Sequence, residues 1–171
     1  TSNDWTAYFE TLPVNHVDLA LSIEADRMVN SLFDPEEVES ERTVILSERQ
    51  GSENSPAYAL YEEVVGAAVQ AHPYRHMVIG TESDLRGLTR DDLFSHYQQH
   101  YHPGNAFIVA VGSFPADSLL QQIEQRFGAI PATGRPTSPV NVIDPPQPGE
   151  RRVIIRKPAG APLLRMAFHA P

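Results

Sequence analysis

The stretch DPEEVESERTVILSERQG, residues 34–51, constrains the fold more than any other part of this sequence. Asp34 is a typical N-cap, Pro35 fits the first helical position, and Glu37 stands at the position of an acidic capping partner. Gly51 then supplies a stop signal. The stretch therefore predicts a helix that begins at Pro35 and ends near Gly51.

Two glutamates within this helix are the most informative residues of the chain. Glu41 and Glu48 are seven residues apart, close to two helical turns, so both carboxylates point the same way. Val38, Val44 and Ile45 fall on the same side of a helical wheel. A carboxylate among apolar side chains is costly to desolvate unless a cation or hydrogen bonds compensate it. A metal ion is one candidate for that compensation.

A plainer interpretation of the two glutamates remains open. Glu41 and Glu48 are each followed directly by an arginine, Arg42 and Arg49. The carboxylates can therefore be solvated or paired with these arginines. In either case they need no metal ion.

Composition limits the class of protein. The chain has 171 residues, 41% hydrophobic and 20% charged, which suits a globular domain with a real core. The net charge of −9 argues against nucleic acid or an anionic membrane as a partner, because both favour surplus Lys and Arg. The sequence has no cysteine, which excludes disulfides and thiolate metal sites. The compartment stays open, with the cytoplasm favoured over the periplasm.

The remaining pattern predicts an α+β fold, with helices packed on one face of a largely antiparallel sheet. Further helices are expected over 15–30, 56–71, 89–100 and 115–127, and strands over 5–12, 105–112, 151–157 and 163–169. Residues 72–88 are expected to be irregular. The proline-rich residues 131–150 are interpreted as a surface connector rather than a protein ligand. Trp5, Tyr8 and Phe9 are expected to pack in the core and sheet.

Two other groups of polar residues have structural interpretations. The first comprises five histidines, at positions 72, 76, 96, 100 and 102. His96 and His100 have the i, i+4 spacing of metal ligands, but no acid is suitably placed between them. We interpret His72 as fixing the irregular segment and the others as surface or half-buried residues. The charged residues of Glu24 to Arg27 are expected to pair within the molecule, with Arg27 bridging to a loop, rather than to contact a substrate.

Several short motifs occur together in an order that resembles the pitrilysin/insulinase-type zinc peptidases (M16), the group that includes the mitochondrial processing peptidase. The resemblance runs through essentially the whole chain. It rests on Thr1-Ser2 with Asp4, Thr6 and Tyr8; Leu19-Ala20-Leu21 and Glu24 to Met28; Glu41 to Glu48; His72-Pro73-Tyr74; Ile79-Gly80; His100-Tyr101 with Pro103 and Asn105; and Val111-Gly112. Each piece is weak alone, and the ordered set is specific.

The resemblance implies a zinc site of the H-x-x-E-H type, with two histidine ligands, a glutamate as general base and a later glutamate as third ligand. It assigns that third ligand to Glu48 and a supporting, orienting role to Glu41. The sequence contains no H-x-x-E-H. By resemblance the motif belongs about 30 residues before Thr1. We therefore expect residues 1–171 to be a partial N-terminal domain, truncated at its start and inactive alone.

The resemblance also implies partners. The parent enzyme is expected to hydrolyse peptides or unfolded polypeptides and to work with a homologous second half or subunit. The alternative is a non-catalytic subunit of the same fold that serves as a substrate clamp or structural partner. If the resemblance is misleading, the chain is instead interpreted as an α+β binding module that uses its histidines to bind metal. We also expect the fragment to self-associate, through an unpaired sheet edge or through bared apolar surface.

Overall fold

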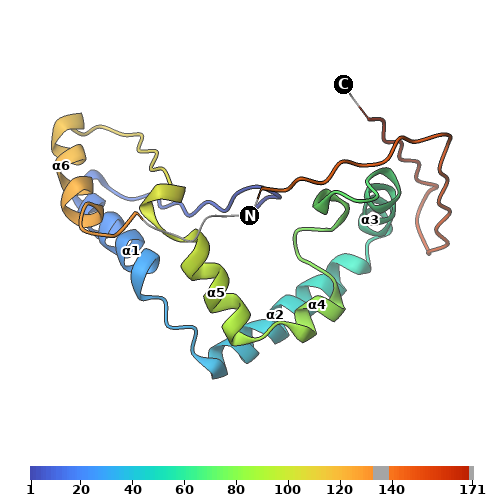
Figure 1. Ribbon diagram of the computed structural model, residues 1–171, viewed down its shortest axis with the longest axis horizontal. Coiled ribbons are helices and arrows are strands. Elements are labelled where there is room, and N and C mark those ends of the chain that lie inside the picture. The colour runs from blue at the N-terminus through green and yellow to red at the C-terminus, as the bar shows by residue number, and fades with distance from the viewer. Residues whose placement is uncertain (133–138, 170–171) are drawn as a thin grey trace. The chain divides into compact units, whose positions relative to one another are not determined.

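The computed structural model describes residues 1–132 and 139–169, and every regular element in these ranges is a helix (Figure 1). No helix there is long and apolar enough to cross a membrane. The elements are the short 3-10 helices η1 (Val14–His16), η2 (Pro73–Arg75) and η3 (Pro103–Asn105), and the α-helices α1 (Val17–Asn30), α2 (Pro35–Glu53), α3 (Pro56–Ala68), α4 (Glu82–Gly87), α5 (Arg90–His100) and α6 (Ala116–Phe127).

The expected sheet is the main error of the sequence analysis. The four segments predicted as strands are extended, but none pairs into a ladder within the described part of the chain. Phe107, Val111 and Leu164 in these segments are 89%, 93% and 84% exposed. An apolar run indicates that a segment suits a buried strand, whereas a strand also needs a neighbour for its N–H and C=O groups. The α+β assignment is therefore wrong for this structure.

The aromatic residues near the N-terminus were also placed wrongly. Trp5 is 62% exposed and Phe9 is 88% exposed, so neither packs in a core. Tyr8 is 46% exposed, although its ring does contact another aromatic side chain. These exposed apolar side chains leave the expected self-association as a prediction.

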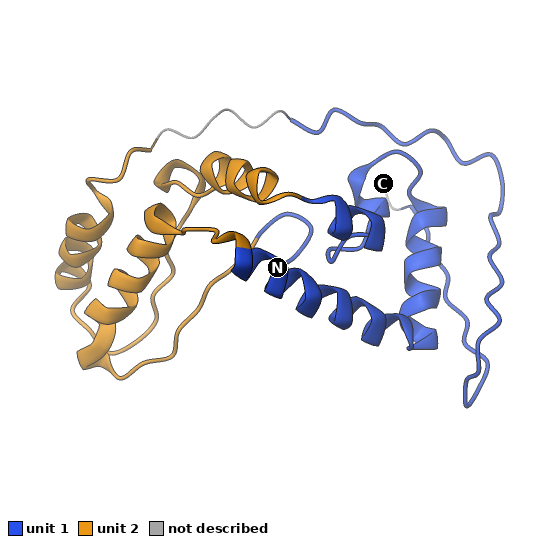
Figure 2. Ribbon diagram, turned by 90° about the horizontal axis from the view of Figure 1, so that it is seen from below, with its two compact units in different colours: residues 1–5, 36–88, 139–171 blue, residues 6–35, 89–138 orange. Residues whose placement is uncertain are grey.

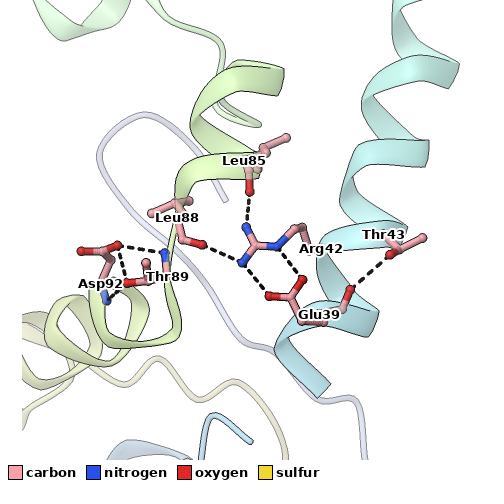
Figure 3. A network of polar contacts seen from close by, with 7 residues as sticks. All are labelled: Glu39, Arg42, Thr43, Leu85, Leu88, Thr89 and Asp92. Carbon is pink, nitrogen blue, oxygen red and sulfur yellow. Dashed lines mark hydrogen bonds and ion pairs between the residues drawn. The ribbon is translucent and has the colours of Figure 1, made fainter. Parts of the chain in front are cut away.

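The helix predictions hold best where a local capping signal exists. The helix predicted from Pro35 begins there and continues to Glu53, past Gly51. Thr89 and Asp92 form a capping box at the start of α5, the helix predicted over 89–100 (Figure 3). The helix predicted from residue 15 begins at Val17 as α1, which follows η1 directly and has no side-chain cap. The segment 72–88, expected to be irregular, contains the short 3-10 helix η2 and the α-helix α4.

Contacts divide the chain into two compact units (Figure 2). Unit 1 comprises residues 1–5, 36–88 and the described part of 139–171, and unit 2 comprises 6–35 and the described part of 89–138. The assignment of residues 1–171 to one partial domain stays a prediction. The connector expected over 131–150 is extended in its described residues, while 133–138 lie outside the described residues.

A set of polar contacts in unit 1 joins the connector to the chain just after α3. The carboxylate of Asp144 accepts hydrogen bonds from the backbone N–H groups of Gln70, Ala71 and His72, at 3.1, 2.7 and 2.8 Å. These three N–H groups hold the pKa of Asp144 below its usual value, with those of His72 and Ala71 contributing most. One carboxylate thereby fastens the connector to the segment that follows α3.

Unit 2 has an aromatic and apolar centre. Tyr97 of α5 is 7% exposed, and its ring lies 5.2 Å from Phe33 and 5.0 Å from Tyr101, centroid to centroid. The Tyr97 hydroxyl donates to the Arg27 carbonyl over 2.8 Å. Helices α1 and α6 also pack together, and an ion pair of 2.6 Å joins Asp18 and Arg126. Aromatic packing and hydrogen bonds to the backbone thus fix α5.

Candidate metal-ligand face of helix α2

The two glutamates singled out by the sequence lie on the surface of α2. Glu41 and Glu48 are both exposed, and neither has a hydrogen bond or ion pair within the described residues. Seven residues of helix separate their Cα atoms by about 10.5 Å along the axis and return to nearly the same direction. The two carboxylates are therefore solvated, rather than enclosed by the apolar side chains expected around them. Val44, for example, is itself 56% exposed.

The buried charge of α2 belongs instead to Arg49, which is 8% exposed. Its Nη1 donates to the Gly80 carbonyl over 2.6 Å, and its Nη2 donates to Glu62 Oε1 over 2.9 Å. Its Nε lies 2.9 Å from Glu53 Oε1. Burial alone disfavours the charge, but the two carboxylates outweigh burial and raise the pKa of Arg49. Arg49 thus joins α2 to α3 and to the turn at Gly80.

The Gly80 turn has a conformation that a side chain would strain. Gly80 has φ +82°, in the region that L-residues rarely adopt. This turn presents the carbonyl that accepts from Arg49. Glycine at this position therefore supports the anchoring of α2.

Arg42, the residue after Glu41, makes a second anchor of α2, and Figure 3 shows its contacts. Its guanidinium donates to the carbonyls of Leu85 and Leu88, the latter over 2.6 Å. Glu39 accepts from Arg42 over 3.1 Å, and this bond lowers the pKa of Glu39. The last carbonyls of α4, which have no partner inside a helix, are satisfied in this way. Arg42 therefore fastens α4 to α2.

These contacts exclude the interpretation that Glu41 and Glu48 pair with the arginines that follow them. Arg42 pairs with Glu39, and Arg49 pairs with Glu53 and Glu62, so neither arginine neutralises Glu41 or Glu48. The Glu-Arg dipeptide repeats at an interval of seven, with the arginines directed into unit 1 and the glutamates into solvent. This role of Arg49 was not predicted from the sequence, although the repeated Glu-Arg dipeptide could have indicated it.

Tyr58 of α3 lies in the electrostatic neighbourhood of this helix. Its hydroxyl is buried without a hydrogen bond among the described residues. Burial raises the pKa of Tyr58, and the negative charges of Glu62, Glu53 and Glu48 raise it further, against the effect of Arg49. Removing a proton from Tyr58 is therefore unfavourable beside these carboxylates.

No complete metal site is assembled within the described part of the chain. Nowhere in residues 1–132 and 139–169 do three His, Cys, Asp or Glu side chains lie close enough together to hold an ion. Glu48 offers a solvated carboxylate, which is chemically suited to zinc as one ligand of several. The donor chemistry of Glu48 thus fits the predicted role, and that role stays a prediction.

The other polar residues behave largely as expected. His72 Nδ1 accepts from the Tyr74 backbone N–H over 3.2 Å and caps η2, which confirms its structural role. Arg27 pairs within the molecule, as expected, but with Glu24 of the same helix, at 2.7 Å, rather than with a loop. Burial and a hydrogen bond with Glu10 nevertheless raise the pKa of Glu24 to about 7, even though Arg27 acts in the opposite sense.

Comparison with known proteins identifies the class of protein to which this chain belongs. Residues 1–82 match the model of "Insulinase (Peptidase family M16)", and residues 87–171 match that of "Peptidase M16 inactive domain". Together the two models account for nearly the whole chain. The chain belongs to the M16 peptidase family, which confirms the resemblance seen in the sequence.

Individual relatives agree with this family. The chain is similar to an uncharacterized zinc protease of Rickettsia felis, with 28% identity over 76% of this chain and 32% of the relative. It is similar to the uncharacterized zinc protease YmxG of Bacillus subtilis, with 28% identity over 80% of this chain and 33% of the relative. It is also similar to a probable mitochondrial-processing peptidase subunit beta of Schizosaccharomyces pombe, with 28% identity over 76% of this chain and 28% of the relative. The chain thus spans 28–33% of the length of these relatives.

A solved structure shares the fold. A protease from Helicobacter pylori superposes with a TM-score of 0.72 at 24% identity, covering 77% of this chain and 32% of that one. At this level of identity the likeness concerns the arrangement of the chain. It agrees with the family found from the sequence.

Proposed function

We propose that this chain is part of a zinc-dependent endopeptidase in which Glu48 binds the metal and Glu41 supports it. The observation that carries the proposal is the pair of exposed carboxylates on one face of α2, with no described cation to neutralise them. The pair lies inside residues 1–82, which match the insulinase family model. Relatives that bear the name zinc protease support zinc as the metal.

The spacing of Glu41 and Glu48 along the helix gives the two carboxylates different roles in metal binding. Zinc–carboxylate bonds are about 2.0–2.2 Å long. Two carboxylates whose backbones are about 10.5 Å apart along a helix are unsuited to bind one ion side by side. One of them binds the ion directly, and the other orients the surrounding ligands through hydrogen bonds. We assign the direct role to Glu48.

Arg42 and Arg49 hold helix α2, and therefore its two glutamates, in a fixed position. Arg49 and Arg42 join α2 to α3, α4 and the Gly80 turn through the contacts described above. A ligand on a rigid helix loses less entropy on binding than one on a loop. Arg49 therefore contributes to metal binding by holding Glu48 in place, without touching the ion.

The rest of the proposed site lies outside these 171 residues, because the sequence has no H-x-x-E-H. Zinc, when bound, would polarise the scissile carbonyl and activate water. Peptides or unfolded polypeptides are the proposed substrates, and a homologous second half or subunit is the proposed partner. The name of one relative as a subunit beta supports an assembly of this kind.

The alternative is a non-catalytic member of the same family. The match of residues 87–171 to a domain described as inactive is the observation in its favour. A subunit of this kind holds substrate or stabilises a catalytic partner, and it has no need for metal at Glu48.

The test uses the full-length protein that contains this chain. Glu48→Gln is expected to abolish zinc binding and peptide hydrolysis while the circular dichroism spectrum stays unchanged. Glu41→Gln is expected to weaken zinc affinity or activity by about 10–100-fold, the usual effect of losing an outer-shell carboxylate. Glu63→Gln in α3 is the matched control, because Glu63 is also exposed and also lacks a described partner.

Zinc content and hydrolysis of an unfolded polypeptide are the two readouts. If Glu48→Gln keeps both zinc and activity, Glu48 is not the ligand. If the unmodified full-length protein neither binds zinc nor hydrolyses peptides, the non-catalytic alternative is correct.

A further inference from the structure

Helix α5 carries a second pair of candidate metal ligands, in unit 2 rather than unit 1. His96 and His100 are four residues apart and therefore share one face of the helix. Their imidazole rings lie 4.3 Å apart, centroid to centroid, with an angle of 33° between the ring planes. Small rotations about the side-chain bonds bring two ring nitrogens toward a common point at this separation.

Both rings are in a state suited to coordination. Neither His96 nor His100 has a side-chain hydrogen bond or ion pair in the described part of the chain. Burial lowers the pKa of His96, and the neighbouring His100 lowers it further. This lowering favours the neutral imidazole of His96, which is the form that binds a metal. No described hydrogen bond has to be broken for either ring to bind.

The helix that holds the pair is well fixed. Thr89 and Asp92 close its N-terminus through a capping box. Its inward face carries Tyr97, which is 7% exposed and donates a hydrogen bond to the Arg27 carbonyl. A rigid helix keeps two ligands at a constant separation, so a second metal–nitrogen bond costs little additional entropy.

We propose that His96 and His100 form a chelating site for a late first-row divalent metal ion such as Ni²⁺, Cu²⁺ or Zn²⁺. Imidazole suits these metals. Within residues 1–132 and 139–169 no third His, Cys, Asp or Glu completes the site. Water fills the remaining positions, so the ion exchanges readily. The site is independent of the glutamates of α2 and of the function proposed for them.

Calorimetric titration of the 171-residue chain with Ni²⁺ alone tests the proposal. His96→Asn and His100→Asn are each expected to weaken Ni²⁺ binding at least tenfold, because either change leaves only one imidazole. His16→Asn is the control in the same unit, since His16 is exposed and stands apart from the pair. This control is not expected to change the affinity.

Paramagnetic NMR on the unmodified chain gives a second readout that does not depend on variants. Substoichiometric Ni²⁺ is expected to broaden the imidazole signals of His96 and His100 together, before those of the other histidines. Unchanged binding in both asparagine variants would overturn the proposal. A loss of binding in His16→Asn, or first broadening at any other histidine, would also overturn it.

Discussion

The arginine side and the glutamate side of helix α2 begin from the same dipeptide and end in opposite environments. Arg49 is 8% exposed and contacts three residues, whereas the adjacent Glu48 is exposed and has no hydrogen bond or ion pair among the described residues. Arg42 and Glu41 differ in the same way. Successive helix positions are 100° apart, so one step along the chain moves a side chain from one environment to another. The arginines stabilise the fold, and the glutamates remain free to bind.

This comparison predicts a large difference in stability between the two sides. Arg49→Met removes the bonds to the Gly80 carbonyl and Glu62 while keeping most of the apolar stem. We expect it to lower the free energy of unfolding by about 2–3 kcal/mol, since it removes several bonds made by a buried charge. Urea denaturation of the 171-residue chain measures the change. Arg152→Met is the control, because Arg152 is exposed and has no described partner. Equal midpoints for the two variants would contradict an anchoring role for Arg49.

The second anchor is expected to matter less and more locally. Arg42→Met leaves the carbonyls of Leu85 and Leu88 to water, which can replace a protein donor at the surface. We expect a loss of about 1–2 kcal/mol. Hydrogen exchange is expected to show faster exchange in α4 than in α3. Protection lost equally in both helices would show that Arg42 does not act locally.

Glu24 in unit 2 has a half-buried carboxylate, whereas the carboxylates of Glu41 and Glu48 on α2 are solvated. The pKa of Glu24 is raised from 4.5 to about 7 by burial and by its hydrogen bond with Glu10. The folded state therefore holds a proton that the unfolded state has released, so this contribution to stability is complete below pH 4.5 and is lost as the pH rises through 7.

Glu24→Gln mimics the protonated carboxyl at every pH. Relative to the unmodified chain, we expect it to gain stability steadily between pH 4.5 and 8. Thermal unfolding across that range measures the gain, with Glu63→Gln as the control for loss of one negative charge. A pH-independent difference would show that Glu24 titrates normally.

The smallest effect on stability is expected on the glutamate side of α2. Glu41→Gln and Glu48→Gln are expected to change the free energy of unfolding by less than about 0.5 kcal/mol, because both side chains are exposed. The urea midpoints of the same chain measure this. A loss comparable with that of Arg49→Met would show that the carboxylates have a structural partner, and would weaken their assignment to metal binding.

Sequence patterns predicted the parts of this structure that depend on neighbouring residues. Pro35 begins α2, and Thr89 caps α5, because a cap and the helix it closes are only a few residues apart. The strands were predicted wrongly because an apolar run such as 105–112 reports composition and not the presence of a neighbour. Helix α4 was missed because it is only six residues long, with breakers around it.

In the candidate site, too, local features were predictable from the sequence and long-range contacts were not. By itself the sequence determined the family and the common direction of Glu41 and Glu48, since both follow from short motifs and helical periodicity. Only the tertiary structure decided which charges are buried. Arg49 is fixed by Glu62 and Gly80, 13 and 31 residues further along the chain. Those contacts depend on how α3 and the Gly80 turn fold back onto α2, which no local pattern specifies.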